Sequence, residues 1–141
     1  MSLGFTSYNK YLLLTLFVVV ASLLSTNIKA EDDPAPTPVY VELLPDFIVN
    51  YGEPGARLKY IKTKINLRTD SNHEGLIILN MPLVRDTLVM FLSTRTPDQV
   101  SGAIAREQTR KDAAVAINEV LKEETGQEPV IDVLFASFVT Q

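Results

Sequence analysis

Hydrophobic and polar positions divide the chain into one unbroken apolar stretch and a longer part with periodic patterns. The apolar stretch covers residues 11–25 and contains no charged side chain. Lys10 precedes it, and the small residue Ala30 stands immediately before an acidic run that begins at Glu31. A positive start, a short apolar centre and a small residue at the end are typical of a secretory signal peptide. Residues 1–30 are therefore predicted to be a signal peptide that is cleaved after Ala30.

A short N-terminal membrane anchor is the alternative for the same segment. Fifteen helical residues would span about 22 Å, whereas the hydrocarbon core of a bilayer is roughly 30 Å thick. A buried helix of a cytosolic protein is disfavoured because the stretch has no amphipathic pattern. Both favoured interpretations place the rest of the chain outside the cytoplasm.

The next segments are predicted to be a linker and a strand. Residues 31–38 combine three acidic residues with three prolines, a composition typical of an extended, solvated linker. From Val39 to Tyr51 apolar residues then recur at every second position, which predicts a half-buried strand, or two collinear strands bent at Pro45. Proline removes one ladder donor, so an edge position is expected. The glycines and proline of residues 51–55 predict a turn that leads into a hairpin.

Residues 57–69 form the second predicted strand, with apolar residues on one face and cations on the other. Leu58 and Tyr60 have the opposite parity to the apolar positions that follow, so a bulge is predicted near Tyr60 or Ile61. The cationic row is predicted to be the solvated face of an antiparallel strand, with an anionic lipid or an acidic partner as the alternative. This row consists of Lys62, Lys64 and Arg68.

In the middle of the chain, apolar residues recur at the three- and four-residue spacing of a helix. Residues 76–93 predict a helix that Pro82 either starts or kinks, although residues 76–79 fit a strand equally well. A second helix is predicted over residues 96–125, with Thr96 and Gln99 forming a capping box at its start and Gly126 at its end. Gly102 is expected to interrupt this helix near its beginning.

The last segment, residues 130–141, carries β-branched and aromatic residues at both odd and even positions. That pattern predicts a strand covered on both sides. The order of elements is therefore β-β-α-α-β. It indicates an α+β fold, with a small antiparallel or mixed sheet and helices on one face.

Composition narrows the chemistry that the chain can perform. The 141 residues include no cysteine and one histidine, which excludes a disulfide scaffold, a thiolate metal site and a histidine-rich metal site. There are 13 basic and 17 acidic residues; without residues 1–30 the count becomes 11 and 17, a net charge of −6. Such an acidic domain is not expected to bind nucleic acid.

No nucleotide-binding or hydrolase motif is present in the sequence. His73 is predicted to be a loop or helix-start residue rather than a ligand or base. Asp132 is an acid within a strongly apolar segment, which fits a structural ion pair or an edge-strand position better than a catalytic acid. Arg85 is the partner that we suggest for Asp132. The protein is therefore predicted to have no enzymatic activity, cofactor, metal or small-molecule substrate.

Three segments resemble one family in the order in which that family has them. Residues 40–51 (YVELLPDFIVNY), 80–86 (NMPLVRD) and 132–141 (DVLFASFVTQ) resemble the conserved blocks of the flagellar basal body-associated protein FliL. The resemblance covers about residues 39–141. Its motif positions, expected to serve structure or interaction, are Tyr40, Glu42, Leu44, Phe47, Asn50, Pro82, Arg85, Asp132, Phe135, Phe138 and Gln141.

This resemblance implies a periplasmic domain similar to the stomatin/prohibitin (SPFH) type, which in the family assembles into rings around the flagellar stator units and helps to sustain torque. The family has no catalytic residues. Typical members have a basic cytoplasmic tail, a full-length transmembrane helix and a longer linker. Because residues 1–38 depart from that pattern, we predict a paralogue released into the periplasm, with inner-membrane attachment as the alternative.

Two functions follow from these observations. The leading hypothesis is a non-enzymatic, ring-forming accessory protein of the flagellar motor that associates with the stator and supports motility or swarming. The alternative is a soluble periplasmic binding or envelope-stress module that reuses the same fold. A third option, a periplasmic hydrolase using Asp132 and an arginine, is disfavoured.

Overall fold

The fold was analysed in a computed structural model that describes residues 35–53, 55 and 57–141. The predicted signal peptide and residues 31–34 of the predicted linker lie outside the described residues. The described elements are β1 (Pro38–Glu42), β2 (Phe47–Tyr51), β3 (Lys59–Asp70), α2 (Glu74–Leu79), α3 (Met81–Ser93), α4 (Pro97–Val100), α5 (Ala103–Thr125) and β4 (Asp132–Thr140). None of the described helices has the length and apolarity needed to cross a membrane.

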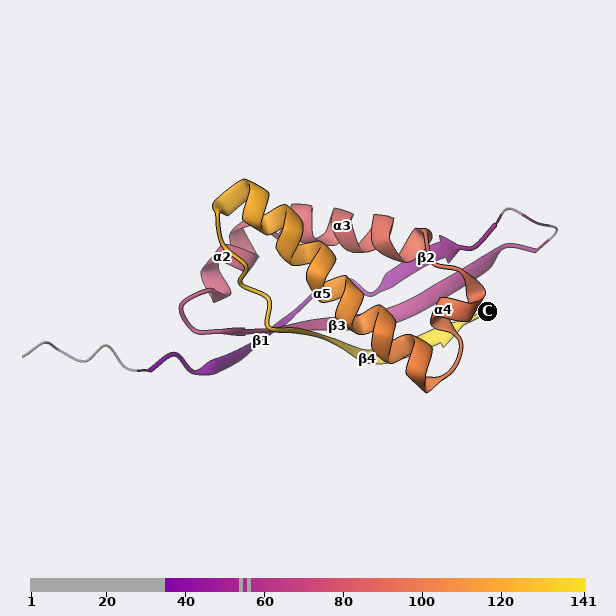
Figure 1. Ribbon diagram of the computed structural model, residues 1–141, viewed down its shortest axis with the longest axis horizontal. Coiled ribbons are helices and arrows are strands. Elements are labelled where there is room, and N and C mark those ends of the chain that lie inside the picture. The colour runs from indigo at the N-terminus through magenta and orange to yellow at the C-terminus, as the bar shows by residue number, and fades with distance from the viewer. Residues whose placement is uncertain (1–34, 54, 56) are drawn as a thin grey trace, which may run out of the picture. The chain divides into compact units, whose positions relative to one another are not determined.

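The long strand β3 forms the centre of an open antiparallel sheet (Figure 1). β1 pairs with the second half of β3, and β2 pairs with the first half of β3. β4 pairs with most of the length of β3. Thr63 illustrates the arrangement, because Phe47 of β2 and Phe138 of β4 are both its partners. The chain bends between β1 and β2, where the Leu44–Pro45 peptide is cis. The predicted pair of strands bent at Pro45, and the predicted hairpin, are thus confirmed.

The predicted bulge at Tyr60 or Ile61 is wrong. Pairing between β2 and β3 is regular from Lys59 onward, and Leu58 simply lies before the strand with 77% of its surface exposed. The irregularity is in β4 instead: Lys64 pairs with Ser137 and Ile65 with Phe135, which leaves Ala136 as the extra residue.

The prediction that the last strand is covered on both sides is also wrong. Within β4 only Val133 is fully buried, and Val139 remains 48% exposed. The bulge explains the misleading pattern. Before it, Phe135 lies opposite the buried Ile65; after it, Phe138 lies opposite the buried Thr63. One face of β4 therefore carries odd positions first and even positions later, so apolar residues occur on both parities.

The helices follow the predicted local signals closely. Residues 76–79 belong to α2, and Pro82 lies in the first turn of a separate helix, α3, so it starts that helix. The predicted helix over residues 96–125 is divided into α4 and α5 at Gly102, whose φ is +83°. The capping box at Thr96 is present, with the Thr96 N–H donating to Oε1 of Gln99 at 2.9 Å. Gly126 ends α5 in the left-handed conformation.

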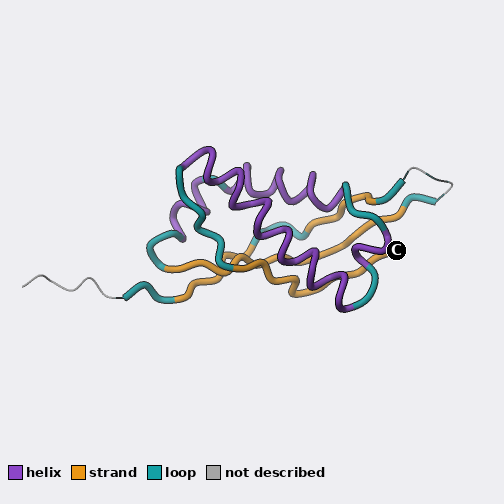
Figure 2. The backbone as a smooth tube through the Cα atoms, viewed as in Figure 1, coloured by secondary structure: helices purple, strands orange, loops and turns teal. Residues whose placement is uncertain are grey.

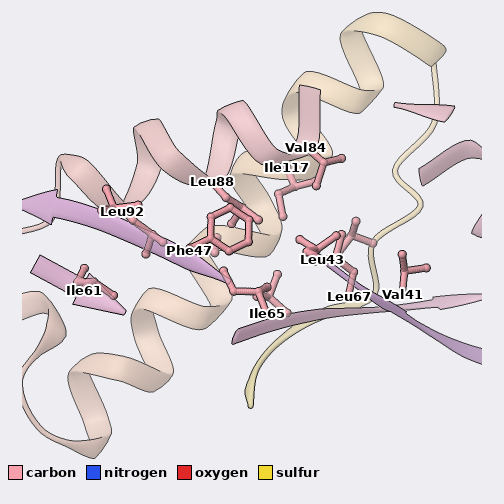
Figure 3. Packing of buried hydrophobic residues seen from close by; sticks show 14 of the residues in the cluster. Val41, Leu43, Phe47, Ile61, Ile65, Leu67, Val84, Leu88, Leu92 and Ile117 are labelled. Carbon is pink, nitrogen blue, oxygen red and sulfur yellow. The ribbon is translucent and has the colours of Figure 1, made fainter. Parts of the chain in front are cut away.

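The core lies between the sheet and the two long helices. The helices lie together on one side of the strands (Figures 1 and 2), and α3 and α5 contact each other as well as the sheet. Figure 3 shows Phe47 beside Leu88 of α3, with Ile65 of β3 beneath and Ile117 of α5 nearby. All four side chains are at most 2% exposed. The α+β prediction with helices on one face of a small sheet is thus confirmed in its architecture.

Candidate functional site

Two predicted motif positions that are far apart in sequence meet where β2 begins beneath α3. The Cζ atom of Arg85 lies 4.2 Å from the ring centroid of Phe47, a distance at which a guanidinium and an aromatic ring attract each other. Nη1 of Arg85 is buried without a hydrogen-bond partner among the described residues. Pro82 places this arginine by starting α3 one turn earlier. The contact joins the first two motif blocks inside the fold.

Other motif positions of the first block are on the surface. Tyr40 is 57% exposed, Leu44 is 63% exposed at the bend, and Glu42 and Asn50 are also exposed. Tyr40, Glu42 and Asn50 have the same parity as the cationic row of β3, on the sheet face away from the helices. These exposed positions are available for contact with another molecule.

The cationic row is on the sheet face opposite the core. Lys62 and Lys64 are exposed and Arg68 is half-buried, whereas the odd positions Thr63, Ile65 and Leu67 are buried. Among the described residues, no helix covers this face (Figure 1). The exposure of the two lysines agrees with the predicted solvated face.

The suggested pairing of Asp132 with Arg85 is wrong, because Asp132 forms its ion pair with Arg110 of α5. Nη1 of Arg110 also donates to the carbonyl oxygen of Val133 at 3.1 Å, and Nη2 donates to Glu107 at 2.7 Å. The Arg110 guanidinium lowers the pKa of Glu107 to about 2. Hydrogen bonding to Glu107 in turn raises the pKa of Arg110. Asp132 is thus held in a half-buried ion pair, which is a structural role.

A groove of about 630 Å³ follows β4 on the side of α5. Its lining includes Arg106 and Arg110 of α5 and Phe135, Ala136 and Phe138 around the bulge of β4. The two phenylalanine rings lie 4.9 Å apart, and the Cζ atom of Arg106 lies 5.4 Å from the Phe138 centroid. Nε of Arg106 donates to the carbonyl oxygen of Val100 at 3.1 Å, which fixes the side chain over the ring.

The sequence did not single out Arg106 or Arg110. Both have helical spacing that assigns them to the solvated side of α5, and their partners are in β4, more than 20 residues away. The only local signal is Glu107, three residues before Arg110, a spacing that favours an ion pair on a helix. That signal identifies a surface pair and not the contact with the sheet.

Gln141, the last predicted motif position, is paired with Tyr60. The backbone N–H and carbonyl groups of the two residues form reciprocal hydrogen bonds of 2.9 and 3.0 Å. The Tyr60 hydroxyl also donates to Oε1 of Gln141 at 2.5 Å. Gln141 therefore extends the pairing of β4 beyond its bulge.

His73 lies at the start of α2, as predicted, with Nδ1 2.9 Å from a carboxylate oxygen of Asp70. The hydrogen bond from His73 lowers the pKa of Asp70. In the part of the chain that the structure describes, no three His, Asp or Glu residues are grouped as a metal site requires. The contacts found at the motif positions are packing, ion-pairing and strand contacts.

Comparison with known proteins assigns the chain that carries these motif positions to one family. A family model described as flagellar basal body-associated protein FliL matches residues 40–141. The chain belongs to the FliL family. A search of curated proteins found no match. The FliL match starts at the first residue of the first motif block and extends through Gln141, so it contains all three blocks. FliL membership makes this an accessory protein of the flagellar basal body, in a family of structural proteins rather than enzymes.

Proposed function

We propose that this protein acts without catalysis beside the flagellar motor, where it associates with the stator and supports torque for swimming or swarming. The observation that carries the proposal is the FliL family match over nearly the whole described domain. In this proposal the domain is of the SPFH type, assembles into a ring of copies, and works in the periplasm or at the periplasmic side of the inner membrane.

The positions of the motif residues support a division of roles. Phe47 and Arg85 are joined within the fold, so we assign them to stability. Tyr40 and Leu44 are apolar or aromatic yet more than half exposed. Exposed side chains of this kind are common at the centre of protein interfaces. We assign Tyr40 and Leu44 to contact with basal-body components or a neighbouring copy.

Deletion of the gene tests the proposal. The expected result is normal flagellation, with reduced swimming speed in viscous medium or reduced swarming. Full-length protein should restore motility, and the double variant Tyr40→Ser, Leu44→Ser should restore it poorly. Ile104→Ser is the matched control, because Ile104 is 89% exposed and lies outside the motif blocks.

Normal motility of the deletion strain in viscous medium would contradict the motor assignment. If that strain were instead sensitive to envelope stress, the soluble binding module would be the better description. Full restoration by the double variant would leave the motor assignment intact and would contradict the contact role of the two exposed residues.

A further inference from the structure

The two edges of the sheet differ in their capacity to accept another strand. The edge formed by β1 and β2 is interrupted by the bend at Pro45, and Pro38 has no N–H donor to offer. β4 contains no proline over its nine residues and is an outer strand of the described sheet. Natural sheets usually block such an edge with proline, charge or a covering element. At Val133 both backbone groups already have partners, because the N–H donates to Asp132 and the carbonyl oxygen accepts from Arg110. Beyond Val133, β4 is the edge at which a further strand can pair.

The groove beside β4 provides the second wall that a bound strand would need. Residues of α5 line one side of this groove and residues of β4 the other. The two elements run beside each other in the fold (Figure 1). Ala136, the bulged residue, is exposed and lines the groove, with Phe135 and Phe138 on either side. A strand that adds to a sheet edge between a helix and a strand gains main-chain hydrogen bonds from the edge and side-chain contacts from the groove.

The charges that line the groove determine the chemistry of the partner. Glu107 and Asp132 share Arg110 as an ion-pair partner, and Nζ of Lys111 lies 3.6 Å from Glu107. Arg106 donates through Nε to Val100, and its two Nη groups have no protein acceptor among the described residues. Arg106 is therefore the cation of the groove lining that remains to pair with a ligand, although the chain as a whole is acidic.

We propose that an extended, acidic segment of another protein binds in this groove as an additional strand beside β4, with one of its carboxylates accepting hydrogen bonds from Arg106. Arginine suits this role because its planar guanidinium donates two parallel hydrogen bonds to a carboxylate. The proposal rests on the groove alone and does not require the association with the stator.

A binding measurement on the full chain tests this proposal. The probe is a fluorescein-labelled heptapeptide of alternating valine and glutamate with blocked termini, followed by fluorescence anisotropy. Two control peptides accompany it: one has lysine in place of glutamate, and the other is N-methylated along its pairing edge. The acidic peptide should bind, and both controls should bind at least about tenfold more weakly, because each loses one of the two kinds of contact.

Two variants locate the binding site. Arg106→Gln should weaken binding of the acidic peptide about tenfold by removing a charge-assisted hydrogen bond. Arg95→Gln is the matched control, because Arg95 also stacks on an aromatic ring, at 4.2 Å from the Phe91 centroid, but does not line the groove. Circular dichroism checks that both variants fold. In the unmodified protein, the peptide should also slow hydrogen exchange of β4 amides.

Three outcomes would overturn the proposal. The first is equal binding of the acidic and lysine peptides, and the second is binding that N-methylation does not affect. The third is concentration-dependent self-association that protects β4 amides without any peptide, since this would make a second copy the occupant of the edge.

Discussion

Replacement of the polar residue Asn118 by alanine should substantially lower the free energy of unfolding of the domain. Asn118 lies in α5, and its side chain bonds to the backbone of Val130, just before β4. Its Nδ2 donates to the carbonyl oxygen of Val130 at 2.7 Å, and the Val130 N–H donates to its Oδ1 at 2.9 Å. The amide thus satisfies both polar backbone groups of a residue that is 4% exposed.

The magnitude follows from those two groups. Leaving a buried backbone donor or acceptor without a partner costs about 1–3 kcal/mol each, so Asn118→Ala should lower the free energy of unfolding by about 3 kcal/mol. A domain of this size is stable by roughly 5–15 kcal/mol, so the loss is a large fraction. With a guanidinium chloride m-value of about 4 kcal/mol/M, the midpoint should fall by about 0.7 M.

Guanidinium chloride unfolding, followed by circular dichroism, measures this change. Asn50→Ala serves as the control, because Asn50 is exposed on the other sheet face and should shift the midpoint very little. Asn118→Asp adds a pH test. It keeps the acceptor for the Val130 N–H but loses the donor, so the neutral form of the new carboxyl is favoured and its pKa is raised. The loss of stability caused by Asn118→Asp should therefore become smaller as the pH falls through that pKa. A loss below about 0.5 kcal/mol for Asn118→Ala would refute the reasoning.

Three further predictions concern the helix contacts. Arg110 lowers the pKa of Glu107 from 4.5 to about 2, so the pair stabilises the fold fully above about pH 4.5 and loses this effect as the pH falls toward 2. Glu107→Gln should therefore flatten that part of the acid-unfolding curve. An unchanged curve would contradict the ion pair. Arg85→Met keeps a side chain over Phe47 and removes a buried, unpartnered N–H. The free energy of unfolding, measured by chemical denaturation, should therefore stay within about 1 kcal/mol of that of the unmodified protein. A larger loss would show that the charge of Arg85 is itself needed. Ile117→Ala, at a position that is 0% exposed, should cost about 2–5 kcal/mol through cavity formation, and a thermal midpoint that does not move would disprove its place in the core.

The sequence was informative wherever the structure depends on neighbouring residues. Pro45 bends a strand, Thr96 and Gln99 begin a helix, and Gly102 and Gly126 interrupt and end one. Each acts through its own backbone or through a residue three positions away. Such effects are fixed by local geometry, so these elements and the α+β class could be predicted from the sequence.

Features that depend on distant residues could not be predicted in the same way. The bulge at Ala136 reverses the parity of β4, and a strand with apolar residues on both parities is then indistinguishable from one buried on both sides. An ion pair was one of the two structural roles expected for Asp132, but the choice of Arg110 over Arg85 depends on how α5 crosses the sheet. The groove was missed for the same reason, because its two walls come from different parts of the chain.

The central position of β3 has a consequence for how this domain folds. Its partners in β4 are 64 to 79 residues away along the chain, so that half of the sheet can close only after a large loop has been ordered. Pairing between such distant strands is slow compared with helix formation. During that interval the edge of β3 that later pairs with β4 is unprotected, and the apolar Ile61, Ile65 and Leu67 of this strand could recruit other chains. Lys62 and Lys64 alternate with these residues, and repulsion between their charges in neighbouring chains opposes aggregation until β4 arrives.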